Sequence, residues 1–400
     1  MLHPAQSAMV DHLGSQCGYC TPGFVMSLFE ATYREDLKSP WQFDDQICGN
    51  LCRCTGYRPI RDALHEVAGT RPDDQFKQVS QTYVDDNPEI TYSNDGQTYH
   101  RPTTWDALWA ALKTPDARIV SGSTDLGLHV TQKHIHYPHL VDLGGLAPLK
   151  RLVETDEMFS IGAGVSLSDL ETWSHSRLPA LSKMLRYFAS RQIKNRATIG
   201  GNLCNASPIG DLPPVLIATD AVAVIQSASG VRRVPFAGHD EVTPGFWLDY
   251  RQTVLAPGEI LSAIEIPRPD KDVYCSSYKV SKRRELDISA VSACFAIRID
   301  ESGRVEQIRA AYGGMAATPA RAYAVENELL GHPLTDERVN AGTRTLATTF
   351  TPMDDHRGSA WYRRTVAENL LRGFVSEFVN QVPVQLSDRP SGTVMSGGVK

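Results

Sequence analysis

The placement of the cysteines constrains this chain more than any other feature of its sequence. Five of the eight cysteines in its 400 residues lie between positions 17 and 54. Four of these form a C-x2-C at Cys17 and Cys20 and a C-x-C at Cys52 and Cys54. Because scattered core thiols do not pair up at ligand spacing, this arrangement predicts a four-thiolate metal site rather than buried structural cysteines.

Two metal centres are compatible with four thiolates. A [2Fe-2S] cluster takes two sulfurs on each iron, whereas one zinc ion takes all four. Zinc sites usually repeat C-x2-C, so the C-x-C half favours iron and sulfide, with zinc as the alternative. The fifth thiol, Cys48, has no ligand role in this interpretation and is expected to be a small apolar residue near the site.

The segments around these cysteines have a helical pattern. Thr21-Pro22 is a helix start signal, with the hydroxyl as the cap and proline at the first helical position. Ile60, Leu64 and Val67 recur at i, i+4 and i+7, as on the buried face of a helix. We therefore expect an all-α domain over residues 1–69.

The rest of the chain predicts two α+β domains. Residues 70–88 are polar and indicate a linker, after which 89–269 mixes short apolar runs with glycine-rich turns. A second α+β domain is expected over 270–384, followed by a loose tail over 385–400. Strands are expected at 292–299 and 304–312, and helices at 105–112, 323–330 and 362–374.

Composition and charge exclude several classes of protein. The 22% of charged and 42% of hydrophobic residues are typical of soluble globular chains. A net charge of -6 gives no reason to expect nucleic acid or an anionic membrane as a partner. No apolar run is long enough to span a bilayer, and the first residues lack the basic start and apolar core of a signal peptide. We therefore expect a cytoplasmic protein.

Two glycine-rich segments are candidates for phosphate binding. Ile119-Val-Ser-Gly-Ser-Thr-Asp125 has the pattern of a strand that ends in a tight turn, and Thr198-Ile-Gly-Gly-Asn202 offers a second loop of small residues. Backbone N–H groups that converge in such turns form nests that suit a pyrophosphate. Neither segment is a G-x-G-x-x-G or Walker loop, and each taken alone is more often a plain turn.

The first of these regions resembles a known family. HPAQSAMVDHLGSQCGYCTPGFVMSLFE and GNLCRCTGYRPIRDAL are similar to the helical [2Fe-2S] domain of the molybdenum hydroxylases, the superfamily of xanthine dehydrogenases, aldehyde oxidases and carbon monoxide dehydrogenases. The resemblance implies that Cys17, Cys20, Cys52 and Cys54 hold the cluster nearest the molybdenum, and it favours iron and sulfide over zinc. It also implies that Gln16 contacts a molybdopterin held by a partner chain; an ordinary loop amide is the alternative.

The central region resembles the FAD domain of the same family. SGSTDLG, FASRQIKNRATIGGNLCNASPIGDLPP and YKVSKRRELDIS carry the match, which implies a two-part FAD-binding fold of the vanillyl-alcohol oxidase (PCMH) type. By themselves, four of the implied FAD contacts favour plainer roles: core for Phe188 and Leu261, a cap or turn for Asp211, and a solvated strand charge for Lys279. The FAD contacts implied by the resemblance are Ile119, Val120, Ser121, Gly122, Ser123, Thr124, Asp125, Leu126, Phe188, Thr198, Ile199, Gly200, Gly201, Asn202, Asp211, Leu261 and Lys279.

The resemblance extends to about residue 380, because RAAYGGMAATPARA and WYRRTVAENLLRGF are similar to the C-terminal domain of the family's flavoproteins. It implies an iron-sulfur and FAD subunit of the xanthine dehydrogenase type. Such a subunit would pair with a molybdenum-binding large subunit that hydroxylates hypoxanthine or xanthine, in a heterotetramer with two copies of each. It would carry electrons to FAD and then to NAD.

Several alternatives stay open. The substrate pocket would lie in the partner chain, so an aldehyde or an N-heterocycle could replace the purine, and no residue of this chain is a candidate acid, base or nucleophile. The segment from Lys282 to Asp287 matches a region where NAD docks in relatives, but Leu286 stands where some of them have an acidic residue, so oxygen is an alternative acceptor. A non-catalytic fragment or assembly protein that keeps the fold is a further alternative.

The start of the chain raises one more expectation. It opens on the His-Pro-x-Gln that follows a plant-type ferredoxin domain in many relatives, and the C-x4-C-x2-C run of that domain is not in the sequence. We expect a fragment, a misassigned start or a separately encoded domain. We also expect this chain alone to pass electrons poorly between molybdenum and FAD.

Overall fold

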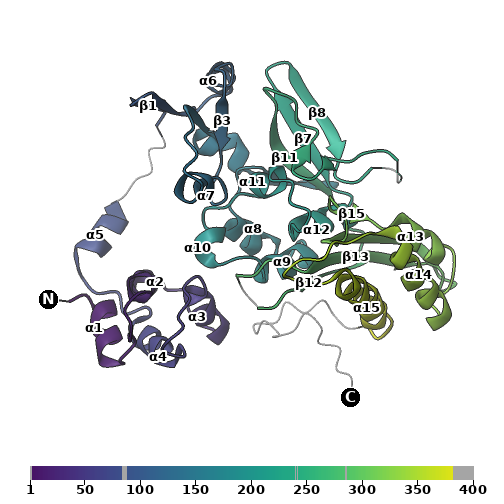
Figure 1. The fold of residues 1–400 in the computed structure, drawn as a ribbon, viewed down its shortest axis with the longest axis horizontal. Helices are drawn as coiled ribbons and strands as arrows, with labels where there is room; N and C mark the ends of the chain where they lie inside the picture. The colour runs from purple at the N-terminus through teal and green to yellow at the C-terminus, as the bar shows by residue number, and fades with distance from the viewer. Residues whose placement is uncertain (1, 83–87, 239, 241, 284–285, 382–400) are drawn as a thin grey trace. The chain divides into compact units, whose positions relative to one another are not determined.

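The N-terminal unit consists of helices alone. The computed structural model describes residues 2–82, 88–238, 240, 242–283 and 286–381, so the predicted tail over 385–400 lies outside the described residues. The chain divides into this unit, to which residues 189–193 also belong, and a larger unit. The helices of the first unit are α1 (Pro4–Asp11), α2 (Thr21–Tyr33), α3 (Pro40–Ile47), α4 (Arg58–Val67) and α5 (Gln75–Thr82) (Figure 1).

Proline starts the first four of these helices. Each of α1 to α4 has proline in its first two positions, where its missing N–H has no intrahelical partner to lose. At α2 the predicted cap is wrong by one residue: Cys20 precedes the helix without a side-chain cap, and the Thr21 hydroxyl instead lies 2.7 Å from that of Ser15. The predicted linker is not all irregular, because α5 lies inside it.

The helices of this unit enclose one apolar core. The predicted face of α4 is confirmed, since Ile60, Leu64 and Val67 are buried. Their burial against α1 and α2 fixes the ends of the two loops that carry the cysteines, one before α2 and one before α4. The core is made of Ala5, Ala8, Met9, Phe24, Leu28, Ala31, Ile47, Ile60, Ala63, Leu64 and Val67.

The larger unit begins with a small mixed sheet. Its strand order is β1-β2-β4-β3, with β1 antiparallel to β2 and the other pairs parallel. Helix α6 (Trp105–Ala111) confirms the expected helix at 105–112, and α7 (Leu126–Thr131) follows the turn after β3. The strands are β1 (Ile90–Asn94), β2 (Gln97–Arg101), β3 (Ala117–Val120) and β4 (His139–Asp142).

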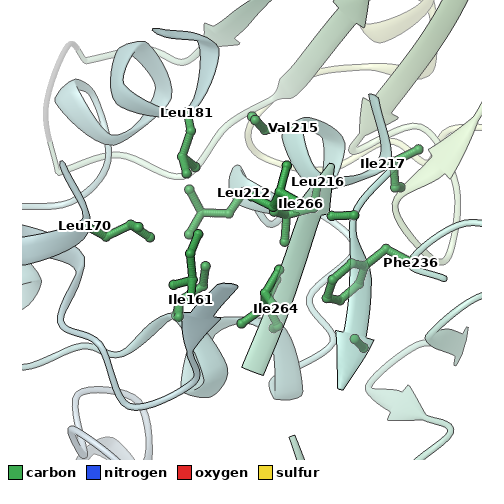
Figure 2. Packing of buried hydrophobic residues seen from close by; sticks show 14 of the residues in the cluster. Ile161, Leu170, Leu181, Leu212, Val215, Leu216, Ile217, Phe236, Ile264 and Ile266 are labelled. Carbon is green, nitrogen blue, oxygen red and sulfur yellow. The ribbon is translucent and has the colours of Figure 1, made fainter. Parts of the chain in front are cut away.

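A second, antiparallel sheet of order β5-β6-β11-β7-β8 carries the main apolar core. Figure 2 shows Ile264 and Ile266 of β11 beside Ile161 of β6 and Leu212 and Leu216 of α12 (Leu212–Ala218). The strands are β5 (Leu152–Glu154), β6 (Met158–Gly162), β7 (Val222–Ser227), β8 (Gly230–Pro235) and β11 (Ile260–Pro267). The other elements here are α8 (Leu167–Ser174), α9 (Pro179–Arg186), α11 (Ile199–Cys204), β9 (Trp247–Asp249) and β10 (Gln252–Thr253). Helix α10 (Arg191–Lys194) lies mostly in the segment 189–193, which belongs to the first unit.

A third sheet, β12-β13-β14-β15, has helices on both faces. The run Val291–Ile297 of β13 is buried throughout, because Cys294 packs in the core cluster that includes residues of α9 and α12, whereas Phe295 packs in the cluster that includes residues of α15. The strands are β12 (Tyr274–Val280), β13 (Val291–Ile299), β14 (Val305–Gly313) and β15 (Ala320–Arg321), and the helices are α13 (Tyr323–Leu329), α14 (Asp336–Thr349) and α15 (Ala360–Val379).

The expected class of a helical domain followed by α+β regions is confirmed, including the predicted strands β13 and β14 and the helices α13 and α15. The domain boundaries at 69, 88, 269 and 384 stay predictions. Sequence analysis did not anticipate α14. None of the helices in the described part of the chain is long and apolar enough to cross a membrane.

Candidate cofactor sites

The four predicted thiolate ligands lie in two loops of the helical unit. Cys17 and Cys20 precede α2, and Cys52 and Cys54 precede α4. The sulfurs of Cys17 and Cys54 are 3.6 Å apart, and the Cys20 and Cys52 side chains are hydrogen-bonding neighbours. Two thiolates on one tetrahedral metal with bonds of about 2.3 Å stand about 3.8 Å apart. The folded loops therefore place the sulfurs of Cys17 and Cys54 at ligand spacing and the side chain of Cys20 next to that of Cys52.

Backbone amides stabilise negative charge on two of these sulfurs. The Thr55 hydroxyl lies 3.1 Å from Cys52 Sγ, and the N–H groups of Cys54 and Thr55 donate to the same sulfur at 3.4 Å. These contacts, led by the hydroxyl, lower the pKa of Cys52 to about 7. The amide of Tyr19 is the main cause of the lowered pKa of Cys17. Since thiolates are the metal-binding form, these loops suit a metal cluster.

The other two thiols have raised pKa values. Burial is the largest cause at Cys20, and the hydrogen bond from Cys54 to Cys17 is the largest at Cys54. Within the part of the chain that the structure describes, no three His, Cys, Asp or Glu side chains converge as they would around a single metal ion. Cys48 has no place in either pair: its sulfur lies 3.9 Å from Asp45 Oδ1 at the end of α3.

The cysteine loops are open to the surroundings. Cys17, Cys54 and Gln16 are exposed, and Gly18 has a φ of +84°, a conformation that side-chain-bearing residues rarely adopt. Tyr19 is 95% exposed, and Leu51 just before Cys52 is 57% exposed. Two large, partly apolar side chains are thus exposed next to the predicted cysteine ligands.

The two glycine-rich loops lie against each other in the larger unit. Ser121 Oγ is 3.0 Å from Thr198 Oγ1, although the two residues are far apart in sequence. Gly122 and Ser123 have φ values of +70° and +65°, so their N–H groups turn away from the β3 ladder. A Cβ on Gly122 would lie 2.1 Å from the Arg196 carbonyl oxygen, so only glycine fits where the loops meet.

The second loop starts a helix and leaves one polar atom without a partner. Thr198 Oγ1 accepts a hydrogen bond from the Gly201 N–H at 3.1 Å and so caps α11. A Cβ on Gly200 would lie 2.7 Å from the Ala163 carbonyl oxygen. Asn202 Oδ1 is buried and accepts no hydrogen bond from protein atoms. Buried acceptors are rarely left unpaired, so this atom fits a ligand that donates to it, as a flavin nucleotide could.

A buried ion pair joins two further predicted residues. Lys279 Nζ donates to Asp211 Oδ2 at 2.7 Å, and the two residues are 3% and 4% exposed. The Ser289 hydroxyl donates to Asp211 Oδ1 at 2.5 Å. The Phe188 ring centroid lies 5.9 Å from Lys279 Nζ. The prediction of a solvated strand charge at Lys279 is therefore wrong. Asp211 stands at the N-cap position of α12, but its side chain makes no capping hydrogen bond there.

The predicted flavin contacts thus fall into separate groups. The loops at 119–126 and 198–202 meet, and Asp211, Lys279 and Phe188 form a second cluster. Leu261 on β11 is 3% exposed and belongs to the apolar core, which agrees with the core role that its residue type alone favoured. Sequence analysis missed Ser289 and Arg196. Ser289 has no local signal, because it reaches Asp211 only through the pairing of β12 with β13.

The segment predicted to contact NAD lines a small cavity. Lys282, Asp287, Ile288, Ala290, His356 and Arg357 surround about 100 Å³. Lys282 Nζ donates to the His356 carbonyl oxygen at 2.6 Å, and the Arg283 N–H donates to Asp287 Oδ2 at 2.9 Å. Arg284 and Glu285 of the same segment lie outside the described residues.

Comparison with known families assigns each region. A [2Fe-2S] binding domain matches residues 1–65, and an FAD binding domain in molybdopterin dehydrogenase matches residues 92–269. A CO dehydrogenase flavoprotein C-terminal domain matches residues 276–378. The chain therefore contains domains for both cofactors, in the order that the sequence predicted.

Similar whole proteins are xanthine dehydrogenases. The chain is 31% identical to that of Emericella nidulans over 98% of its own length and 33% of the relative, and 32% identical to that of Drosophila subobscura over 83% and 29%. It spans about a third of the length of these relatives. Among solved structures, carbon monoxide dehydrogenase from Hydrogenophaga pseudoflava matches 71% of this chain and 96% of its own with a TM-score of 0.64 and 28% identity.

Proposed function

We propose that this chain, which belongs to the molybdenum hydroxylase family and contains its iron-sulfur and FAD domains, is an electron-transfer subunit. It would carry electrons from a molybdenum cofactor on a partner chain to FAD and then to NAD. The observation that carries the proposal is the presence in one chain of thiols paired at 3.6 Å and of two glycine loops joined at 3.0 Å. The proposed enzyme is of the xanthine dehydrogenase type, with a purine as the molybdenum site's substrate.

The cysteine loops would hold the [2Fe-2S] cluster. Cys17, Cys20, Cys52 and Cys54 would ligate it as thiolates, and the amides that donate to Cys52 would offset the cluster's negative charge. Hydrogen bonds to cluster sulfurs raise the reduction potential, so these donors would make the cluster a better electron acceptor.

The helical unit would also dock the partner. Exposed Gln16, beside Cys17, would contact the molybdopterin, and exposed Tyr19 and Leu51 would be buried against a molybdenum-binding large subunit. An apolar rim around a redox group excludes water and shortens the path for an electron, which supports docking at this surface. A heterotetramer with two copies of each chain would place one such interface on each half.

The glycine loops would hold the FAD pyrophosphate. N–H groups of the 119–126 turn and the α11 start would donate to phosphate oxygens, and Asn202 Oδ1 would accept from a hydroxyl or N–H of the nucleotide. Asp211, Lys279 and Phe188 would line the flavin side, with Leu261 packed beneath. FAD, when bound, accepts electrons singly and delivers a pair as hydride.

NAD would dock at the cavity formed by Lys282, Asp287, His356 and Arg357. The lysine and arginine supply positive charge for a dinucleotide phosphate, and Asp287 offers an acceptor for a ribose hydroxyl. This arrangement supports NAD over oxygen as the acceptor, because oxygen needs no charged site.

An absorbance spectrum of the purified chain, with iron and acid-labile sulfide assayed alongside, tests the cofactors. We expect flavin and iron-sulfur bands with about two irons per flavin. A colourless protein that contains zinc or no metal would contradict the electron-transfer proposal. The acceptor is tested separately: dithionite-reduced, desalted protein is mixed with NAD, and NADH fluorescence should appear faster than flavin is reoxidised in air.

A further inference from the structure

Two cysteines outside the cofactor sites lie in contact on the third sheet. Cys275 is on the edge strand β12 and Cys294 is on β13, and their sulfurs are 3.7 Å apart. The strand register pairs Cys275 with Ala296 and Ser277 with Cys294, so the two thiols are diagonal neighbours. Both face the same side, toward α9 and α12. The contact is therefore built by the strand pairing and not by a mobile loop.

The surroundings of this pair differ from those of a metal site. Lys183 of α9 lies against the same strand: its Nζ donates to Ser276 Oγ at 3.0 Å and lies 4.5 Å from the Tyr278 ring centroid. Burial lowers the pKa of Lys183, and the negative charge of Glu377 opposes that shift. Among the described residues, no third Cys, His, Asp or Glu completes a metal-binding group with the two thiols.

The two thiols lie in contact but are not equally accessible to an oxidant. The two sulfurs differ in access, since Cys275 is partly exposed and Cys294 is fully buried. The partly exposed thiol is the one that an oxidant meets first, and the buried thiol in contact with it can then resolve the product. This is the arrangement of an attacking and a resolving cysteine.

We propose that Cys275 and Cys294 are a redox-modification site, a dithiol that a peroxide converts to an intramolecular disulfide, and that the disulfide loosens the contact of Lys279 with Asp211. The Cys275 thiolate attacks one oxygen of hydrogen peroxide, the O–O bond breaks, and Cys275 sulfenic acid and hydroxide form. The Cys294 thiol then attacks the sulfenic sulfur, the S–S bond forms and water leaves. The hydroxide takes the proton lost by Cys275, so the dithiol is oxidised by two electrons and two waters are released.

The geometry of the strands connects this bond to the flavin side. A disulfide needs its sulfurs about 2.05 Å apart and its Cα atoms usually within about 6.8 Å, whereas diagonal neighbours stand about 7–8 Å apart. The edge strand β12 must therefore shift toward β13 when the bond forms. Cys275, Ser277 and Lys279 are every second residue of β12 and therefore lie on the same face of the strand. The shift would thus move Lys279 relative to Asp211, which precedes α12. A bond formed under such strain is also readily reduced, which makes the modification reversible.

The redox pair stands apart from the proposed function, whereas its effect on FAD rests on the proposed flavin role of Lys279. The full chain is treated with graded hydrogen peroxide, quenched with catalase, alkylated and digested without reductant, and linked peptides are identified by mass spectrometry. We expect a Cys275–Cys294 linked pair that dithiothreitol removes. Cys275→Ser and Cys294→Ser should each abolish it, and the matched control Cys204→Ser should retain it.

Two results would overturn the proposal. Cys275 found as sulfinic acid with Cys294 still free would exclude the disulfide in the wild-type chain, without reliance on a variant. For the flavin effect, the rate of FAD release is followed by fluorescence, and we expect several-fold faster release after peroxide in the wild type and no change in Cys294→Ser. Equal release rates would exclude the link to Lys279. A chain that never binds FAD would contradict the proposed function, while the peptide result would still decide the redox pair.

Discussion

The two sets of paired cysteines in this chain have similar sulfur separations and opposite chemistry. Cys17 and Cys54 are 3.6 Å apart in exposed loops, and Cys275 and Cys294 are 3.7 Å apart on neighbouring strands. In the loops, hydrogen-bond donors lower the pKa of Cys52 to about 7. On the sheet, burial raises the pKa of Cys294 well above its ordinary value.

The difference lies in the balance between hydrogen-bond donors and burial at each sulfur. In a loop the backbone N–H groups are free to donate to a sulfur, as those of Cys54 and Thr55 do, and they stabilise a thiolate. On the sheet, the Phe295 N–H also interacts with the Cys294 sulfur and acts to lower its pKa, but burial is the larger effect, so the pKa of Cys294 is raised. Under the two proposals above, the same side chain would serve as a metal ligand in one region and as a resolving thiol in the other.

The sharpest way to break this comparison is to remove a loop thiol. In Cys52→Ser we expect the iron content to fall from about two per chain to near zero, because a [2Fe-2S] cluster requires its four thiolates. Iron assay and visible absorbance measure the loss. The control Cys48→Ser, which removes the thiol outside both pairs, should keep its iron; equal loss in both variants would show that the pairing does not identify the ligands.

The next largest effect is expected at the buried ion pair of Asp211 and Lys279, because a buried charge without a partner lowers the stability of the fold. Asp211→Ala would leave Lys279 buried and uncompensated, and we expect a loss of about 3–5 kcal/mol in the free energy of unfolding. The double variant Asp211→Leu with Lys279→Met should recover most of that loss. Urea unfolding followed by fluorescence measures both, and a single variant as stable as the double one would refute the uncompensated-charge explanation.

A smaller effect is expected in the glycine loops, which resemble the cysteine loops in leaving N–H groups free. Gly122→Ala would meet the Arg196 carbonyl oxygen at a φ of +70°, at a cost of about 1–3 kcal/mol. FAD binding, measured by fluorescence titration, should weaken as well. Gly127→Ala is the matched control, because its Cβ would meet nothing closer than the Ser123 hydroxyl at 3.8 Å.

The smallest effect is expected from removing a hydrogen-bond donor to the Cys52 sulfur, and it is measured in iron-free protein. The Thr55 hydroxyl is the largest cause of the lowered pKa of Cys52, so Thr55→Val should raise that pKa toward its ordinary value. Since the thiolate is the reactive form and its fraction rises as pH passes the pKa, Cys52 alkylation near pH 7 should slow several-fold. Peptide mass spectrometry after iodoacetamide treatment measures the rate. Thr55→Ser keeps the hydroxyl and should react as the wild type does.

The predictions from sequence succeeded where the signal was local. The C-x2-C and C-x-C spacings predicted that Cys17 and Cys54 lie near each other, and their sulfurs are 3.6 Å apart, while their ligand role stays a prediction. The periodicity of Ile60, Leu64 and Val67 predicted the buried face of α4. The helix cap at Thr21 failed, because a cap depends on backbone angles at a single residue. Helix α14 was missed because its apolar stripe is interrupted by polar residues.

By itself, the sequence determined which residues could bind metal and phosphate, because spacing and small side chains act within a few residues of one another. Only the tertiary structure decided that Lys279 meets Asp211, that Ser121 meets Thr198 and that Cys275 meets Cys294. The physical reason is that these contacts join segments distant in sequence, through strand register and helix packing, which bury a charge or a thiol according to neighbours that no local pattern specifies.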